Sequence, residues 1–245
     1  MLQLDRVMQK TYEIKYHEQN MQGVLKESSL LNILQDIATL SAETLGFGPT
    51  FVFSNNYAWV VLKYHLEFYK EIKNISAIKV KTEPRGISKL YAFRDFEIYS
   101  EQDELLGRVA SAWVLIDMDS RKMLPIQKVL DFMPAFEKRE NDLDYGKVDS
   151  FDESTFSKIF DVRFDDIDVN KHANNSNYIV WALETLPDDF RLNHYVKNID
   201  IKYRKEIGLG AKVQADVFVG EDYTLHKISD CSNNEELCSL KIEWV

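Results

Sequence analysis

The strongest constraint on the fold of this chain is that its sequence repeats itself. Both copies open on the same order of aromatic, aliphatic, basic and acidic side chains: Tyr12, Ile14, Lys15, Tyr16 and Glu18, then, 148 positions later, Phe160, Val162, Arg163, Phe164 and Asp166. The segment LEFYKEI at 66–72 returns as IKYRKEI at 201–207, and Trp113-Val114 returns as Trp244-Val245. Three matches in one order indicate two copies of a domain, the second with shorter loops.

Each copy begins with an extended segment, at 10–16 and 157–164, and a turn that leads into a helix. We expect the first helix from Ser28 to Leu45, capped by Ser28 or Ser29 and stopped by Gly46. Its apolar residues leave little polar face: Leu30, Leu31, Ile33, Leu34, Ile37, Ala38, Leu40, Ala42 and Leu45. A helix that is apolar on most sides is buried, so other elements must wrap around it.

Alternating apolar and polar residues predict strands that could form this wrapping. The predicted strands are 59–68, 75–82, 91–99 and 105–116 in the first copy, and 196–203, 212–219, 225–231 and 236–245 in the second. Pro84-Arg85-Gly86 is typical of a turn between strands. The fold class is therefore α+β, with two tandem domains that each wrap an antiparallel sheet around a long buried helix. The predicted boundaries are 1–125 for the N-terminal domain, 126–155 for a charge-rich linker from one sheet to the other, and 156–245 for the C-terminal domain.

Composition excludes several classes of protein. Hydrophobic residues at 45% and aromatic residues at 12% describe a globular chain, and a net charge of −10 argues against general nucleic-acid binding. The sequence has no apolar run that could span a bilayer and no secretory signal, so we expect a cytoplasmic protein without membrane insertion. Cys231 and Cys238 are close enough for a hairpin disulfide, although reduced thiols are favoured. Neither has the neighbours of a zinc site, and we expect neither a metal nor a cofactor.

The polar chemistry of the chain is concentrated in the segment 160–184. Asp168, Asn170 and His172 place a carboxylate, an amide and an imidazole two residues apart, and an extended segment would direct all three to one side. A helix is expected directly afterwards, and its first backbone N–H groups suit a developing oxyanion. These groups belong to Asn174, Asn175 and Ser176. The alternative interpretation is a turn rich in Asn and Asp that only caps a helix.

The repeat provides an internal control for these residues. At the same offset of 148, the trio falls opposite Asn20, Gln22 and Val24, so the first copy lacks both the carboxylate and the imidazole. This difference favours a site in the second copy alone. Glu71 and Glu206, in contrast, match each other in the two copies. Glu206 is therefore either a strand-end carboxylate or a fourth member of the site.

These motifs resemble those of a known family. The pattern D-x-N-x-H, followed by N-N-x-x-Y and then Y-R-x-E-x-G at 203–208, resembles the acyl-acyl carrier protein thioesterases, which are double hotdog-fold enzymes. The likeness covers nearly the whole chain. It implies two tandem hotdog domains and hydrolysis of a fatty acyl thioester to a free fatty acid, with Asp168, Asn170, His172 and Glu206 as the catalytic set. Some relatives carry Cys directly after the glutamate, but Ile207 excludes a covalent cysteine there.

The resemblance suggests a role for each member of this set. Glu206 and His172 would position and deprotonate a water molecule. Asn170 would hold the water or the thioester carbonyl, and Asp168 would orient Asn170 and His172 or cap the next helix. The N–H groups at 174–176 would form the oxyanion hole.

The resemblance also implies substrate contacts outside this set. The first domain would face the acyl chain, for which Leu34, Ala38 and Trp59 are candidates, with plain core packing as the alternative. An acidic acyl carrier protein would need a locally basic surface on this acidic chain. The candidates are Lys171, Lys197, Lys202 and Arg204, with ordinary solvated lysines as the alternative. The sequence is also compatible with a homodimer, and it leaves the chain length and the carrier, acyl carrier protein or CoA, open.

Two other functions compete with hydrolysis. A double-hotdog hydratase or dehydratase also uses Asp and His, but its motif D-x-N-P-x-H has a Pro and one more residue of spacing than the segment 168–172. The other alternative is a non-catalytic acyl-binding module, against which the intact set of Asp, Asn, His and Glu speaks.

Overall fold

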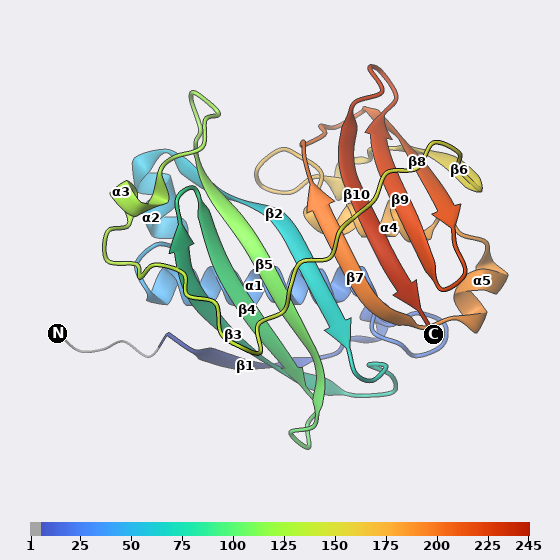
Figure 1. Cartoon of the computed structure of the whole chain (residues 1–245), viewed down its shortest axis with the longest axis horizontal. Helices are drawn as coiled ribbons and strands as arrows, with labels where there is room; N and C mark the ends of the chain where they lie inside the picture. The colour runs from blue at the N-terminus through green and yellow to red at the C-terminus, as the bar shows by residue number, and fades with distance from the viewer. Residues whose placement is uncertain (1–5) are drawn as a thin grey trace.

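Ten antiparallel strands form one continuous sheet in the computed structural model, which describes residues 6–245. The N-terminal half contributes, in order across the sheet, β1 (Met8–Glu13), β3 (Ala77–Ser88), β4 (Tyr91–Tyr99), β5 (Leu105–Asp117) and β2 (Tyr57–Phe68). The C-terminal half continues with β7 (Val196–Tyr203), β10 (Glu236–Trp244), β9 (Tyr223–Asp230), β8 (Lys212–Val219) and β6 (Phe156–Asp161). Figure 1 shows the two halves side by side, with β2 and β7 at their junction.

The two halves share one sheet because β2 pairs directly with β7. The register runs from Lys63 opposite Lys202 to Glu67 opposite Asn198. We call this pairing the β2–β7 seam. The sequence had predicted two separate sheets joined by a linker, and that expectation was wrong because a strand alternation does not reveal which edges meet.

One helix of each half packs on the same face of the sheet, behind it in Figure 1. Helix α1 (Glu27–Thr44) buries Leu30, Leu34 and Ile37, and it contacts α4 (Asn175–Leu183). The α+β prediction is thus confirmed, although α4 has nine residues and only α1 is long. Three shorter helices complete the set: α2 (Pro49–Asn55), α3 (Ile126–Val129) and α5 (Asp188–Asn193).

The cap predicted for α1 was wrong. The helix begins one residue before Ser28, after Lys26, and no side chain caps it. Lys26 instead donates from Nζ to the carbonyl of His17, 2.8 Å away, which ties the helix start to the preceding turn. Gly46 lies just past the helix end with a φ of +85°, as a terminating glycine requires.

The repeated residues occupy equivalent elements in the two halves. β1 and β6 are followed by 3₁₀ turns η1 (Tyr16–Glu18) and η2 (Phe164–Asp166), which lie 148 positions apart like the sequence match. The acidic residue of each turn accepts a backbone N–H three residues earlier: Lys15 to Glu18 at 2.7 Å, and Arg163 to Asp166 at 2.8 Å. The sequence repeat therefore preserves a hydrogen bond as well as a pattern of side chains.

Pro84, Arg85 and Gly86 do not form the predicted turn. They lie inside β3, where the register to β4 shifts between Pro84 and Gly86 in a β-bulge. Gly86 has a φ of +124°, and a Cβ there would lie 2.8 Å from the carbonyl oxygen of Pro134. The glycine is required by the backbone, as the sequence indicated, but it lies at a β-bulge beneath the linker and not at a chain reversal.

The linker crosses the face of the sheet opposite the helices, as Figure 1 shows. Arg85, whose side chain is 2% exposed, forms an ion pair with Asp142 of the linker, with Nη2 and Oδ2 3.0 Å apart. The hydrogen bond from Arg85, together with the neighbouring charges, holds the pKa of Asp142 below its ordinary value. Further along, Gly146 N donates to Asp200 Oδ1 of β7 at 2.7 Å. The linker is therefore fastened to both halves.

Within residues 6–245, no helix is long and apolar enough to cross a membrane. Both cysteines are free thiols. Cys238 is fully buried, and burial raises the pKa of its thiol.

A buried histidine lies on the seam beneath the linker. His65 of β2 stands opposite Asp200 of β7, with Nδ1 and Oδ1 2.7 Å apart, and its Nε2 lies 3.3 Å from Glu67 Oε1. Burial lowers the pKa of His65, but the hydrogen bonds and charges of Asp200 and Glu67 outweigh burial, so the pKa is raised overall.

This raised pKa predicts a pH-dependent seam. A protonated His65 contributes stability that is fully present below its unfolded pKa of about 6.5 and is lost as the pH rises through the higher folded pKa. The free energy of unfolding should therefore fall as the pH rises above about 6.5, the unfolded pKa of a histidine. Denaturant titrations of the wild type and His65→Gln should show a flatter pH dependence in the variant. The exposed His17→Gln serves as the control, and an unchanged slope in His65→Gln would contradict the prediction.

Candidate active site

The segment from Asp168 to His172 is a tight turn rather than the extended segment that the sequence suggested. Asp168 N donates to the carbonyl of His172 at 2.9 Å, and Lys171 N donates to the carbonyl of Asp168 at 3.0 Å. Lys171 has a left-handed φ of +66°. The carboxylate of Asp168 closes the turn, because Oδ1 accepts Asn170 N at 2.8 Å and Oδ2 lies 3.4 Å from Asn170 Nδ2. Asp168 thus holds both the backbone and the side-chain amide of Asn170.

The first half contains the same turn. Asn20 N donates to the carbonyl of Val24 at 2.8 Å, Gly23 N donates to the carbonyl of Asn20 at 3.0 Å, and Gln22 N donates to Asn20 Oδ1 at 2.9 Å. Gly23 supplies the left-handed residue, with a φ of +77°. In both halves, a side-chain oxygen of the first turn residue accepts a backbone N–H and so stabilises the turn. This structural role alone would explain an Asp at position 168. The side chains of Asn170 and His172 have no such role in stabilising the turn.

His172 and Glu206 meet beside this turn. Nδ1 of His172 lies 3.4 Å from Oε2 of Glu206, and both side chains are 34% exposed. The contact lacks hydrogen-bond geometry, and His172 Nδ1 is a buried atom without a hydrogen-bond partner among residues 6–245. An imidazole and a carboxylate at this separation can share the task of orienting and deprotonating one water molecule.

Arg121 is a member of this cluster that sequence reasoning missed. Its guanidinium forms an ion pair with Oε2 of Glu206, so a residue just past β5 of the first half contacts the second half. The two residues are 85 positions apart, and Arg121 lies in a charge-rich stretch without a motif. Its left-handed φ of +55° would have drawn attention to it, but backbone angles are not visible in a sequence.

The hydrogen bonds at the start of α4 reduce the number of N–H groups that are available for the expected oxyanion hole. Asn174 caps the helix, and its Oδ1 accepts both the N–H and the hydroxyl of Ser176, each at 2.9 Å. Asn174 N itself donates to the carbonyl of Asp166 at 2.8 Å. Two of the three expected N–H groups are thus already used within the protein. For Asn175 N–H, the described part of the chain supplies no acceptor.

A largely apolar cavity of about 380 Å³ opens beside the turn. The turn contributes Val169 and Asn170, and most of the other lining residues come from the first half: Ala38, Ala42, Phe47, Val52, Phe53, Tyr57, Trp59, Ala92, Phe93, Arg94, Trp113 and Met133. Ala38 and Trp59 are thus placed where the sequence expected acyl contacts. Leu34 does not line this cavity, because it is fully buried in the core.

Arg94 gives this cavity one charged wall. The side chain is buried, and Nη1 donates to Ser41 Oγ at 3.0 Å and to Thr82 Oγ1 at 3.1 Å. Within residues 6–245, no carboxylate forms an ion pair with Arg94. Burial lowers the pKa of Arg94 to about 10, so the guanidinium is still charged at neutral pH.

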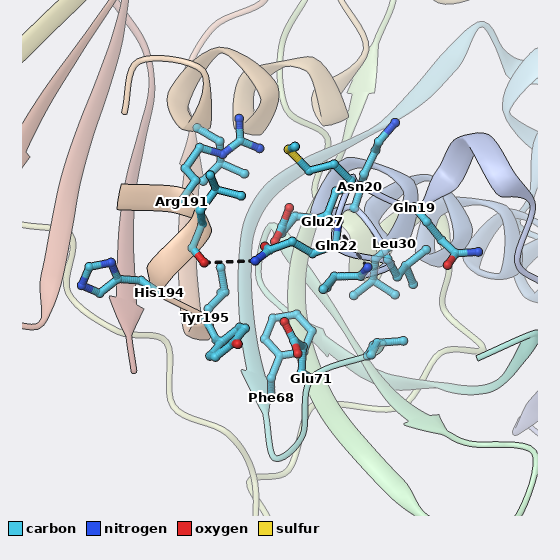
Figure 2. Close-up of a pocket in the computed structure, with 18 of the residues that line it drawn as sticks. Gln19, Asn20, Gln22, Glu27, Leu30, Phe68, Glu71, Arg191, His194 and Tyr195 are labelled. Atoms are coloured by element: carbon cyan, nitrogen blue, oxygen red, sulfur yellow. Dashed lines mark hydrogen bonds between the residues drawn. The ribbon is translucent and has the colours of Figure 1, made fainter. Parts of the chain in front are cut away.

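A second cavity, of about 520 Å³, occupies the equivalent place beside the turn of the first half. Figure 2 shows the side chain of Gln22 extending across this cavity, where Nε2 donates to the carbonyl of Leu192 at 3.0 Å. Glu71 lies below Gln22 in this view, beside Phe68. Burial raises the pKa of Glu27, another lining carboxyl group. Val24 stands where the second half has His172, so the turn of the first half brings no imidazole to this cavity. The imidazole that does line it, His194, follows α5.

The four basic residues expected to bind a carrier protein do not form one cluster. Lys171 is exposed on the turn, and Arg204, just past β7, forms an ion pair with Glu236 at 2.6 Å. Lys202 is half-buried opposite Lys63. Lys197 lies at the opposite end of β7 from Arg204.

Two family models match the chain. One, the acyl-ACP thioesterase N-terminal domain, matches residues 5–132, and the other, the acyl-ACP thioesterase C-terminal domain, matches residues 149–245. The chain belongs to the acyl-ACP thioesterase family. The family resemblance stated from the motifs is thereby confirmed.

Curated relatives support the same family. The chain is 26% identical over 215 residues to oleoyl-acyl carrier protein thioesterase of Coriandrum sativum, covering 79% of this chain and 57% of the relative. It is 27% identical over 237 residues to palmitoyl-acyl carrier protein thioesterase of Gossypium hirsutum, covering 91% of this chain and 57% of the relative. The chain thus spans little more than half the length of these relatives.

Solved structures share the fold. The acyl-ACP thioesterase from Bacteroides thetaiotaomicron superposes with a TM-score of 0.86 at 19% identity, covering 98% of both chains. The 12:0-ACP thioesterase from Umbellularia californica gives a TM-score of 0.86 at 21% identity, again covering 98% of both chains.

The shared turn predicts how substitutions of Asp168 affect stability. Asp168→Asn keeps the side-chain oxygen that Asn20 uses, so the free energy of unfolding should change by no more than about 0.5 kcal/mol. Asp168→Ala removes the acceptor and should cost about 1 kcal/mol. Denaturant unfolding of both variants measures this difference. Equal losses in the two variants would show that the carboxylate does more for the fold than an Asn can.

Proposed function

We propose that this chain hydrolyses fatty acyl thioesters carried on acyl carrier protein and releases free fatty acids. The observation that carries the proposal is the pairing of His172 with Glu206 beside the turn whose Val169 and Asn170 line an apolar cavity. The family to which the chain belongs supports the substrate class. The cavity supplies room for an acyl chain, and the turn contributes the polar side chain of Asn170 to its lining.

The reaction begins with a water molecule bound beside the pair of His172 and Glu206. The water oxygen bonds to the thioester carbonyl carbon while its proton passes to the imidazole–carboxylate pair. Asn170 faces the cavity and is held by Asp168, so its amide can orient the water or the carbonyl. The N–H of Asn175 is the free donor at the helix start for the carbonyl oxygen as it becomes an oxyanion. The C–S bond then breaks, and the proton is returned to the leaving thiolate.

The acyl chain extends from this point into the first half. Ala38 and Trp59 line its path, and Trp59 is fixed by a hydrogen bond from Nε1 to the carbonyl of Phe47 at 2.8 Å. Leu34 does not contact the acyl chain directly. It lies in the hydrophobic core, where it packs α1. The charged wall at Arg94 makes part of the cavity unfavourable for a hydrocarbon chain.

The carrier protein approaches the exposed side of the turn. Lys171 stands next to His172 in the turn, and Arg204, just past the end of β7, comes two residues before Glu206, so both are close in sequence to the site. Lys202 follows the same strand, whereas Lys197 is a weaker candidate because it lies at the far end. A cytoplasmic location and a homodimer remain predictions from the sequence.

His172→Ala tests the chemistry. Loss of the imidazole should lower kcat for an acyl-carrier-protein substrate by about 10²- to 10⁴-fold, the usual scale for a general base. His194→Ala is the matched control, because His194 lines the second cavity and stacks on Phe190. Free thiol release and product analysis together measure the reaction. A folded His172→Ala protein with wild-type activity would reject the assignment, and accumulation of a hydrated acyl thioester would favour the hydratase instead.

Lys171→Gly tests the docking role without disturbing the turn. The first half places Gly23 at the equivalent left-handed position, so glycine fits the backbone there. We expect KM for acyl carrier protein substrates to rise several-fold and to depend less on salt, because one surface charge is lost. KM for a small acyl thioester should stay unchanged. Equal increases for both substrates would argue against a contact with the carrier.

A further inference from the structure

We propose that Arg121 is a positioning residue for the hydrolysis proposed above. Its guanidinium holds Oε2 of Glu206, which leaves Oε1 as the oxygen that takes the proton of the attacking water. The inference rests on the proposed function, and it extends the site to a residue of the first half that no motif marks.

The contacts of Glu206 distinguish its two oxygens. Oε2 receives the ion pair from Arg121 and lies 3.4 Å from Nδ1 of His172. Oε1 forms no hydrogen bond with the part of the chain that the structure describes, residues 6–245. A carboxylate held through one oxygen keeps its orientation, and its other oxygen is available to a substrate water.

The turn that carries Arg121 is built independently of Glu206. Asp117 Oδ1 accepts the N–H of Ser120 at 2.8 Å and its hydroxyl at 2.7 Å, and Arg121 N donates to the carbonyl of Asp117 at 2.9 Å. Met118 N donates to the carbonyl of Asn56 at 3.0 Å, which ties the turn to the end of α2. The guanidinium therefore starts from a fixed backbone, in a left-handed conformation that arginine seldom adopts.

The equivalent glutamate of the first half has a different partner. Glu71 forms its ion pair with Lys73, two residues along the same segment, at 3.6 Å. Among residues 6–245, Glu206, which faces His172, is the one of these two glutamates that an arginine from the other half holds. The arginine contact is therefore not a feature that the two repeats share. It occurs in the half that carries the proposed catalytic residues.

Arg121 should matter to the rate more than to the fold. The side chains of Arg121 and Glu206 are 44% and 34% exposed, and ion pairs exposed to this degree contribute little stability. A carboxylate that loses its holder samples other rotamers, and misplacement of a reacting group by about 1 Å can slow a reaction about 100-fold. Binding of the acyl chain, which takes place in the cavity, should be affected little.

The test compares Arg121→Ala, Arg121→Lys and the control Arg191→Ala by steady-state kinetics with an acyl carrier protein substrate. Arg191 forms a similar ion pair with Glu184, at 2.7 Å, beside the second cavity. We expect kcat to fall about 100-fold in Arg121→Ala with KM changed less than about twofold. Arg121→Lys should recover part of the rate, and guanidinium ion added to Arg121→Ala should raise kcat, which a purely structural role would not permit. Arg191→Ala should keep the wild-type rate.

Three results would overturn the inference. They are a wild-type kcat in Arg121→Ala, a raised KM with unchanged kcat, which would make Arg121 a carrier contact, and a loss that guanidinium ion does not relieve in a protein with wild-type thermal stability. A wild-type protein and an Arg191→Ala control that both fail to hydrolyse the substrate would instead reject the proposed function itself.

Discussion

The pairing of β2 with β7 is the interaction on which the rest of the structure depends. It turns two five-stranded units into one sheet, and so sets the position of every residue of one half relative to the other. The proposed active site needs this alignment, because the apolar cavity and Arg121 come mainly from the first half while His172 and Glu206 come from the second. His65 and Asp200 add a buried contact across the same seam, and the linker covers it through Gly146. Neither half alone contains the complete set of groups.

The two turns show how one backbone can serve two purposes. Asp168 and Asn20 use a side-chain oxygen in the same way, to accept the N–H two residues later. Beyond that oxygen the turns diverge, because Asn170 points to a cavity while Gln22 spans the other cavity and bonds to the far side. The charge of Asp168 is therefore not required by the backbone, and its value must be sought in how it holds the amide of Asn170.

Much of this arrangement is visible in the sequence, and the exceptions have physical causes. The strands at 91–99, 196–203 and 212–219 were predicted to the residue, because alternation is strong where one face of a sheet packs on helices. Prediction failed where distant segments decide the local structure. The linker passes over Gly86 and turns an apparent chain reversal into a bulge, and Lys26 replaces a serine cap by reaching His17. The partnership of Arg121 with Glu206 depends on the seam, which no local pattern encodes.

The left-handed residue of each turn bears on how the two copies diverged. Glycine adopts this conformation without strain, whereas a lysine there costs on the order of 1 kcal/mol. The copy without the imidazole carries Gly23, and the copy with His172 and Glu206 carries Lys171. The backbone conformation is the same in both turns, but only the half that holds the proposed site accepts the strain of a side chain there.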